Sequence, residues 1–242
     1  MNINNNIFRA YDIRGIAYKE LTEDLVFTLG KSIGTSVLEL GETSLIIGRD
    51  GRNSSPDLKK WLSEGVMSTG CDVINIGVVP TPLLYFSTHK LQSSSGVMIT
   101  GSHNPAEFNG FKISSGLHSL YGEKIKRLKW IIDTGKFAQG VGKKISQNIL
   151  NAYMDKVCQV IQLPRPVKVV VDGGNGCFGI AGINLLKRLG LDPVELYCEP
   201  DGSFPNHHPD PTVAKYLTDL IATVKSEKAD SWLDELRGRI GK

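Results

Sequence analysis

Two stretches of the chain share one pattern of apolar and polar positions. Each begins with an apolar run, turns at an Asp-Gly-x-Asn segment (50–53 and 172–175), continues through a stretch with helical spacing, and ends with a glycine and a second apolar run. From the aspartate of the turn to the valine of the second run there are 23 residues in the first stretch and 22 in the second. The pattern predicts two strand–helix–strand units, with helices at about 56–67 and 180–189.

The repeat predicts an α/β protein with two similarly built domains. Near-continuous apolar strands are typical of parallel strands covered on both faces, so we expect mixed, mostly parallel sheets covered by helices. The glycine-rich segment 135–142 marks the boundary, which places one domain at 1–140 and the other at 141–242. Amphipathic spacing predicts helices at 146–161 and 213–225. One such unit and a last helix make only part of a sheet, so we expect the second domain to be incomplete.

Composition narrows the class of protein. The 242 residues are 40% hydrophobic and 22% charged, which is typical of a soluble globular protein. The net charge of +3 comes without a long basic run, which argues against a nucleic-acid partner. No apolar run approaches the roughly 20 residues that span a bilayer. The four cysteines form no C-x-x-C pair, so we expect no zinc site and a cytoplasmic protein with reduced thiols.

A serine follows a predicted buried strand at 96–100. Ser102 lies in Gly101-Ser102-His103-Asn104-Pro105, at the carboxyl end of that strand, where open α/β sheets place ligands. Taken alone, an ordinary turn serine is the favoured interpretation, and the hydrolase pattern G-x-S-x-G is not present. Lys112, ten residues further on, could face the same crevice, although alone it is better interpreted as a solvated lysine on an edge strand.

The wider sequence resembles the α-D-phosphohexomutases of the phosphomannomutase/phosphoglucomutase kind. Thr100-Gly101-Ser102-His103-Asn104-Pro105, followed by Asn109-Gly110-Phe111-Lys112, is similar to the active-site loop of that family. Further segments match in the family's order, at 8–15, 48–52, 79–82, 171–176 and 204–211. The resemblance covers about residues 7–230, and several long motifs in order make coincidence a poor explanation.

The resemblance implies an isomerase of carbohydrate metabolism and a phosphoprotein. Such enzymes move a phosphoryl group between the C6 and C1 oxygens of a hexose phosphate through a phosphoserine, with a hexose 1,6-bisphosphate as activator. It assigns catalytic roles to Ser102, Lys112 and His103, with Ser102 as the phosphoryl carrier. It assigns phosphate or substrate binding to Arg14, Tyr11 and Asn104. The motifs favour the mannose and glucose branches over the N-acetylglucosamine and glucosamine branches.

The sequence departs from the family at its magnesium loop. The family holds Mg²⁺ with three alternating aspartates and an oxygen of the serine phosphate, here that of Ser102. Asp230 lies where the family's first aspartate is expected, but Asp234 and Glu235 do not continue the alternating spacing. Mg²⁺ needs several well-placed oxygen ligands. We therefore expect no competent Mg²⁺ loop, and weak or no mutase turnover by this chain alone. We expect a truncation by frameshift or early stop, which the DNA beyond codon 230 would test.

An incomplete second domain has a structural consequence. A sheet that lacks strands exposes an edge and apolar surface. We therefore expect either a homodimer formed through that edge or a poorly ordered C-terminal region.

Other interpretations compete with the mutase. Gly174, Gly176 and Gly179 satisfy G-x-G-x-x-G after an apolar strand, and Glu195 lies near the acidic position of a dinucleotide-binding oxidoreductase. A non-catalytic remnant that binds a phosphosugar or a protein is another alternative. The adjacent pair His207-His208 is interpreted as part of a structured loop rather than as a metal site, because neighbouring side chains on an extended segment point apart.

Overall fold

The computed structural model describes residues 5–115, 118–210, 212–234 and 239–241. Its contacts divide the chain into two compact units. The first contains residues 1–101 and 107–148, and the second contains 102–106 and 149–242. Each unit is a sheet with helices packed against it, so the predicted α/β class with mixed, mostly parallel sheets is confirmed.

The first unit is built on a seven-stranded sheet. Its strands are β1 (Ile13–Ile16), β2 (Ser44–Arg49), β3 (Asp72–Val78), β4 (Gly96–Ile99), β5 (Phe108–Ser115), β6 (His118–Ser119) and β7 (Lys144–Ser146). The order is β1-β5-β4-β2-β3-β7, with β6 beside β5. β4, β2, β3 and β7 run parallel to their neighbours in that series, whereas β5 is antiparallel to β1, β4 and β6. The carboxyl ends of β2 and β4 therefore meet at one edge of the sheet.

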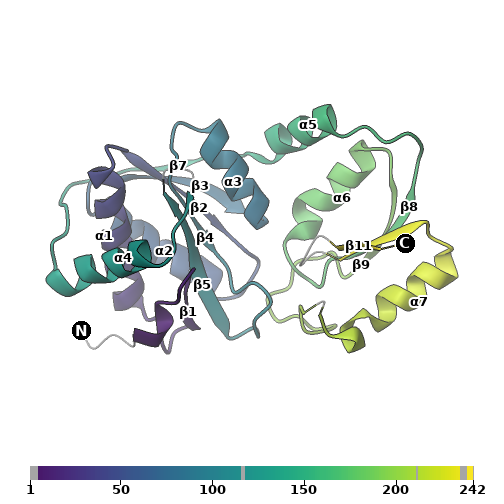
Figure 1. Cartoon of the computed structure of the whole chain (residues 1–242), viewed down its shortest axis with the longest axis horizontal. Helices are drawn as coiled ribbons and strands as arrows, with labels where there is room; N and C mark the ends of the chain where they lie inside the picture. The colour runs from purple at the N-terminus through teal and green to yellow at the C-terminus, as the bar shows by residue number, and fades with distance from the viewer. Residues whose placement is uncertain (1–4, 116–117, 211, 235–238, 242) are drawn as a thin grey trace. The chain divides into compact units, whose positions relative to one another are not determined.

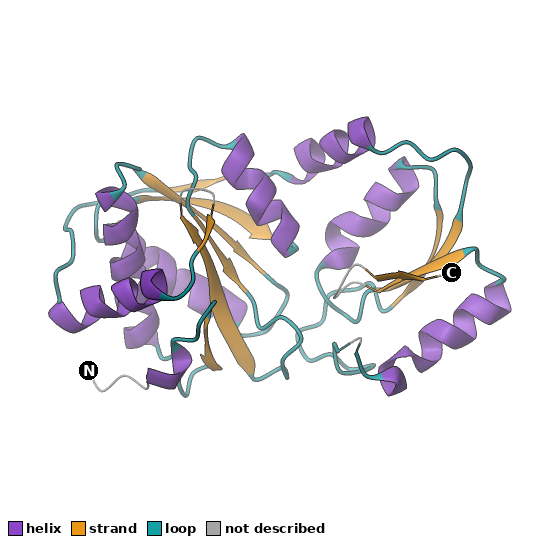
Figure 2. Ribbon diagram, in the orientation of Figure 1, coloured by secondary structure: helices purple, strands orange, loops and turns teal. Residues whose placement is uncertain are grey.

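Helices cover both faces of this sheet (Figures 1 and 2). The helical elements are η1 (Asn5–Ile7), α1 (Glu23–Glu39), α2 (Ser55–Met67), α3 (Thr81–Lys90) and α4 (Glu123–Thr134). α1, α2 and α4 lie on one face and α3 lies on the other. The hydroxyl of Thr22 accepts a hydrogen bond from the Leu25 amide and so caps α1, which begins with two acidic residues as the helix dipole favours.

α1 and α2 approach each other closely because each has a glycine at the contact. A Cβ added at Gly65 would lie 2.0 Å from the carbonyl oxygen of Phe27, and one added at Gly30 would lie 2.3 Å from that of Leu62. The two helices are thus packed backbone to backbone, and they bury apolar side chains against β2 and its neighbours.

The second unit is built on a four-stranded sheet. Its elements are α5 (Leu150–Val160), β8 (Lys168–Asp172), α6 (Phe178–Arg188), β9 (Asp192–Leu196), η2 (Ala214–Leu217), α7 (Thr218–Glu227), β10 (Ser231–Asp234) and β11 (Arg239–Gly241). The order is β11-β10-β8-β9, with β8 parallel to both neighbours and β11 antiparallel to β10. α5 and α6 pack on one side and α7 on the other (Figure 1).

Three expectations need correction. The predicted helix at 146–161 begins only at Leu150, because residues 144–146 form the short strand β7 beside β3. The predicted helix at 213–225 is split between η2 and α7. Lys112 does not lie on an edge strand, since β5 lies between β1 and β4 and the lysine is half-buried.

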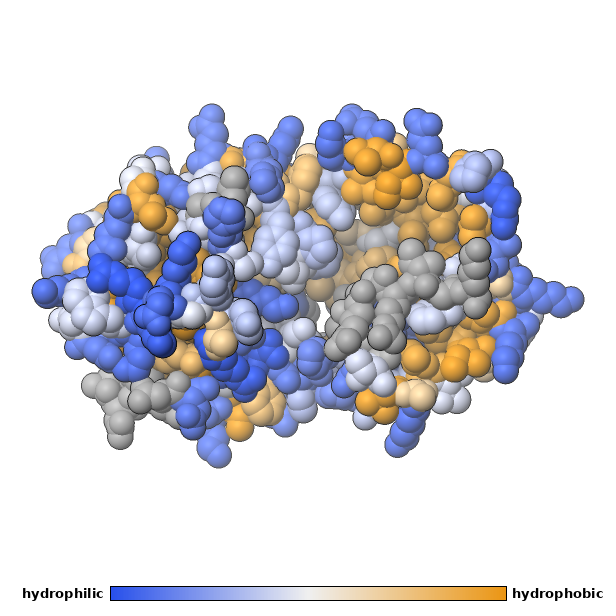
Figure 3. Space-filling model, viewed as in Figure 1, coloured by the Kyte–Doolittle hydropathy of each residue, from blue (hydrophilic) through white to orange (hydrophobic). Residues whose placement is uncertain are grey.

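Exposed apolar side chains of the second unit gather over α5 and α6 on the face seen in Figure 3. Val160, Ile161 and Leu163, at and after the end of α5, are exposed. Among the residues that the structure describes, no helix is both long and apolar enough to cross a bilayer.

Candidate active site

The turn after β2 is organised by the carboxylate of Asp50. Its Oδ1 accepts hydrogen bonds from the Arg52 amide at 3.1 Å and from the Ser55 hydroxyl at 2.6 Å. Its Oδ2 accepts one from the Gly101 amide, which follows β4, at 3.2 Å, and lies 3.3 Å from Nε of Arg52. One buried carboxylate therefore ties the ends of β2 and β4 together and holds the residue that precedes Ser102.

Arg52 packs against Gly101, the residue that precedes Ser102. It is 1% exposed, and its Nη1 donates to the carbonyl oxygen of Phe108, at the start of β5, at 3.0 Å. Burial lowers the pKa of its guanidinium, and the charge of Asp50 opposes that shift. A Cβ on Gly101 would lie 2.4 Å from Cζ of Arg52, so the guanidinium can pack here only because residue 101 is glycine.

Arg14 and Lys112 come together on neighbouring strands. Arg14 pairs with Gly110 across β1 and β5, and its Nη2 donates to Asp12 at 2.6 Å. Burial lowers the pKa of Lys112, and the charge of Arg14 lowers it further, while Asp12 and Asp50 oppose the shift. Within the described residues, the buried Nε of Arg14 has no hydrogen-bond partner. This strand pair thus holds a buried cation with a spare donor beside a lysine that gives up its proton more easily than usual.

Ser102 has an unusual backbone conformation. Its φ is +54°, in the left-handed region that non-glycine residues seldom adopt, and such residues cluster at functional sites. Ser102, His103 and Asn104 belong to segment 102–106 of the second unit, whereas Arg14 and Lys112 belong to the first. Tyr11, also in the first unit, is 77% exposed.

Asp50 and Arg52 are functional candidates that the sequence reasoning did not single out. The signal was present in the repeat, because Arg52 occupies the position that Gly174 holds in the second Asp-Gly-x-Asn turn. The aspartates play the same local role, since Oδ1 of Asp172 accepts from the Gly174 amide at 2.9 Å. The bulky cation at position 52 is therefore not needed to form the turn.

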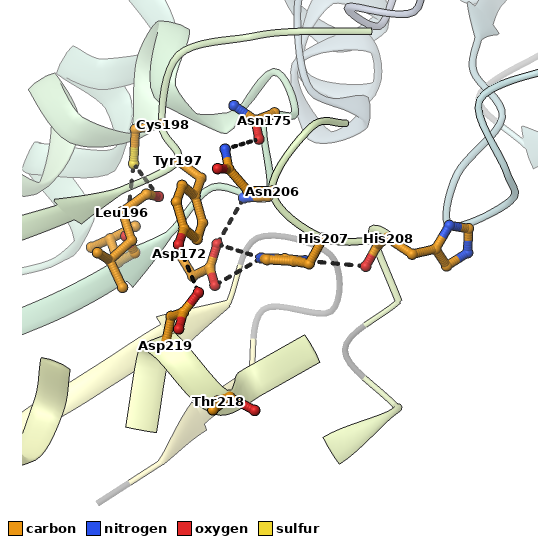
Figure 4. A network of polar contacts seen from close by, with 12 residues as sticks. Asp172, Asn175, Leu196, Tyr197, Cys198, Asn206, His207, His208, Thr218 and Asp219 are labelled. Atoms are coloured by element: carbon orange, nitrogen blue, oxygen red, sulfur yellow. Dashed lines mark hydrogen bonds and ion pairs between the residues drawn. The ribbon is translucent and has the colours of Figure 1, made fainter. Parts of the chain in front are cut away.

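In the second unit, the corresponding aspartate is held by a histidine. Asp172 is 1% exposed, and its Oδ2 lies 3.0 Å from Nε2 of His207 (Figure 4). The other ring nitrogen of His207 lies 3.1 Å from the carbonyl oxygen of His208. Tyr197 packs its ring edge-on against His207 and donates its hydroxyl to Asp219 at 2.7 Å. His207 thus anchors the loop after β9 to the end of β8.

This anchor gives the second unit a pH-dependent stability. The hydrogen bond to Asp172 raises the pKa of His207 above its ordinary value of about 6.5. Burial opposes this shift, and the His208 carbonyl and the charges of Asp172 and Asp234 add smaller upward contributions. A histidine with a raised folded pKa stabilises fully below its unfolded pKa, and this contribution is lost as the pH rises through the folded pKa.

We therefore expect the second unit to become less stable as the pH rises above about 6.5. Amide hydrogen exchange of peptides from β8 and β9 at several pH values, corrected for intrinsic exchange, measures this. His207→Gln should remove the dependence, and His208→Gln, whose side chain makes no contact with Asp172 among those described, serves as the control. An unchanged pH dependence in His207→Gln would contradict the assignment.

The features that suggested other functions have structural explanations. Gly179 is needed for packing, since a Cβ there would lie 1.8 Å from the carbonyl oxygen of Cys198. Glu195 forms an exposed ion pair with Lys187 at 2.9 Å. Gly176, the second glycine of the motif, closes a turn, because its amide donates to the Gly173 carbonyl at 2.7 Å. Nothing in this arrangement supports the dinucleotide-binding alternative.

The acidic residues near the expected metal loop lie apart. Asp230 precedes β10 and accepts hydrogen bonds from the Lys168 amide at 2.9 Å and from Arg165 at 3.1 Å. Asp234 ends β10 and is buried beside Asp172 across the sheet. Glu235 lies outside the described residues. Within the described part of the chain, no group of three histidine, cysteine or acidic side chains could hold a metal ion.

Comparison with known proteins connects both units to one family. The family model "Phosphoglucomutase/phosphomannomutase, alpha/beta/alpha domain I" matches residues 5–139, and the model for domain II matches 151–233. A phosphomannomutase/phosphoglucomutase of Pseudomonas aeruginosa is 46% identical over 225 residues, covering 93% of this chain and 49% of that protein. A phosphoglucomutase of Neisseria meningitidis is 44% identical, covering 95% of this chain and 50% of that protein.

The solved structures agree. The crystal structure of a phosphoglucomutase/phosphomannomutase family protein from Burkholderia thailandensis matches with a TM-score of 0.92 and 38% identity, over 95% of this chain and 52% of that one. The chain spans about half the length of the curated relatives that it matches. On the two family models and these identities, the chain belongs to the α-D-phosphohexomutase family, in its phosphoglucomutase/phosphomannomutase group.

Proposed function

We propose that this chain carries the phosphoserine half of a phosphomannomutase/phosphoglucomutase, with Ser102 as the residue that holds the phosphoryl group. The observation that carries the proposal is the buried cation Arg14 on β1, whose charge helps to lower the pKa of Lys112 on the neighbouring strand β5, in the unit that presents Gly101. Phosphoryl transfer depends mainly on positioning and on stabilising negative charge, and these groups are suited to both tasks.

Ser102, Lys112 and Arg14 have separate tasks in this mechanism. The bond between phosphorus and Oγ of Ser102 breaks while a bond forms to a sugar hydroxyl oxygen, whose proton passes to Lys112. Arg14 supplies N–H donors to the phosphate oxygens. His103 and Asn104 line the same segment as Ser102, and Tyr11 offers a phenol to the substrate. The bisphosphate then reorients, and the reverse transfer returns the other phosphate to Ser102.

Members of this family generally use Mg²⁺, but the described residues do not fit such a site. Asp230 is engaged by Arg165 and Lys168 at the amino end of β10, and Asp234 lies at the other end. Mg²⁺ requires several oxygens in near-octahedral arrangement, which these two carboxylates do not supply. We therefore expect steady-state mutase turnover by this chain alone to be weak or absent.

Incubation with glucose 1,6-bisphosphate tests the proposal. We expect intact-mass spectrometry to show a species heavier by about 80 Da, the mass of one phosphoryl group, with the modification mapped to Ser102. Ser102→Ala should remove that species, and Ser94→Ala, which changes a serine two residues before β4, should retain it. A wild-type chain that takes up no phosphoryl group at Ser102 would overturn the proposal. It would favour a remnant that only binds a phosphosugar or a protein.

A further inference from the structure

We infer that Arg52 is a positioning residue, which together with Asp50 holds both ends of the serine loop and so sets the rate of phosphoryl transfer at Ser102. The serine loop is residues 100–107, between β4 and β5. The kinetic part of this inference rests on the function proposed above. The structural part, that the pair holds the loop, stands independently.

Both ends of the loop meet the same ion pair. At its start, the Gly101 amide donates to Oδ2 of Asp50 at 3.2 Å. At its end, the Phe108 carbonyl accepts from Nη1 of Arg52 at 3.0 Å. Asp50 and Arg52 are joined at 3.3 Å and are 8% and 1% exposed, so water does not compete strongly for these contacts. The ion-paired side chains of Asp50 and Arg52 therefore fix the separation of the loop's two ends.

A second set of contacts supports the end of the loop from α2. The side-chain amide of Asn109, which is fully buried, donates to the hydroxyls of Ser54 and Ser55 at 2.9 Å each. The Ser55 hydroxyl in turn donates to Asp50. The Asp50 carboxylate thus belongs to one connected network that reaches β2, β4, β5 and the start of α2.

The chemistry at position 52 requires arginine. A guanidinium carries several nitrogens in a rigid plane, so Nη1 can donate to the Phe108 carbonyl while Nε forms an ion pair with Asp50. The guanidinium also packs against Gly101, with its Cζ 2.4 Å from where a Cβ would lie. A lysine has one flexible ammonium and cannot reproduce both contacts with the same geometry.

The second unit shows that the arginine is not a requirement of the turn. There the equivalent aspartate, Asp172, forms the same turn with Gly174 at the arginine's position. Its carboxylate is held by His207 from a different loop. The first unit therefore carries a cation at position 52 for a purpose beyond turn formation. Holding the adjacent loop is the purpose that its contacts indicate.

Positioning of this kind has a large kinetic effect. A displacement of about 1 Å at the reacting group can cost a factor of about 10² in rate. Because Arg52 acts through the loop and not on the substrate, its loss should slow the transfer without weakening substrate binding.

The experiment compares Arg52→Lys and Asp50→Asn with the wild-type chain. The control is Asp172→Asn, which removes the equivalent carboxylate charge from the second unit. Amide hydrogen exchange of peptides covering 100–108 reports on the loop, and a time course of Ser102 phosphorylation at several glucose 1,6-bisphosphate concentrations reports on transfer. Thermal unfolding of each variant identifies any chain that fails to fold.

We expect loop exchange to rise about tenfold or more in Arg52→Lys and to remain unchanged in Asp172→Asn. The maximal rate of Ser102 phosphorylation should fall about 30- to 100-fold in Arg52→Lys, while the half-saturating bisphosphate concentration changes by less than about twofold. Asp50→Asn retains the side-chain shape but has one acceptor oxygen in place of two. It cannot accept from the Gly101 amide on one side and from the Arg52 amide and the Ser55 hydroxyl on the other, so it should loosen the start of the loop.

Loop exchange that stays at the wild-type rate in both folded variants would overturn the inference. A rise in the half-saturating concentration with an unchanged maximal rate would also overturn it, because it would place Arg52 in substrate binding. If the wild-type chain takes up no phosphoryl group, the proposed function fails, and hydrogen exchange alone then decides whether the pair holds the loop. If Arg52→Lys does not fold, the same exchange test on Asp50→Asn decides the question.

Discussion

Replacing Lys112 with glutamine is expected to slow the phosphorylation of Ser102 by glucose 1,6-bisphosphate by a factor of about 10² to 10⁴. Burial and the charge of Arg14 lower the pKa of Lys112. Near neutral pH, a larger fraction of Lys112 is therefore unprotonated than for an ordinary lysine. Glutamine retains a polar side chain of similar length but cannot take up or release that proton. The time course of the phosphoryl mass shift on Ser102 measures the effect.

Lys59→Gln is the matched control. Lys59 lies on α2, and burial lowers its pKa too, with further lowering by Lys144 and Arg49. We expect its replacement to leave the phosphorylation rate within about twofold of wild type, because a lysine outside the site contributes no proton transfer. If both variants phosphorylated Ser102 equally slowly, the positive charge of the first unit as a whole would explain the effect. That result would contradict a specific role for Lys112.

The second large effect is on stability. Replacing Gly65 with alanine is expected to lower the free energy of unfolding of the first unit by about 1–3 kcal/mol or more, as overpacking does. The new Cβ would lie 2.0 Å from the backbone carbonyl oxygen of Phe27, so α1 and α2 must move apart. Chemical denaturation followed by circular dichroism measures the change.

The sign of this result is informative. In a helix interior, alanine is favoured over glycine by about 1 kcal/mol from backbone entropy alone. An increase in stability would therefore show that the helices separate without cost and that the close approach is not important. Gly135→Ala provides the control, because its φ of +65° gives a strain cost of about 1–2 kcal/mol without any steric contact within 4 Å.

The parts of the fold that were predictable are those with local periodicity. The repeated strand–turn–helix pattern predicted the helix at 56–67, observed as Ser55–Met67, and the one at 180–189, observed as Phe178–Arg188. β7 was missed because three exposed residues carry no pattern, and its place depends on pairing with β3, some 70 residues earlier. The position of Lys112 within the sheet depends on β1 pairing with β5, more than 90 positions later in the chain, which no local signal indicates.

The residues of the candidate site also fall into two groups, those that a local motif identifies and those that only long-range contacts reveal. Ser102 and Lys112 were identified because they belong to motifs that can be read along the chain. Asp50 and Arg52 were recognised only as part of a motif, because their contacts with Gly101 and Phe108 join residues about 50 positions apart. The anchoring of Asp172 by His207 was hidden for the same reason, although the expectation of a structured loop at 207–208 agrees with the contacts found there.

The left-handed backbone at Ser102 limits which amino acids can occupy this position. Threonine carries the same hydroxyl, and by reactivity alone the two residues would be interchangeable as phosphoryl acceptors. A φ of +54° is tolerated by serine at moderate cost, but it is a severe outlier for a β-branched residue, whose extra methyl group crowds the backbone. The conformation of the main chain at this position therefore favours serine over threonine, its closest chemical substitute, independently of the reactivity of the hydroxyl.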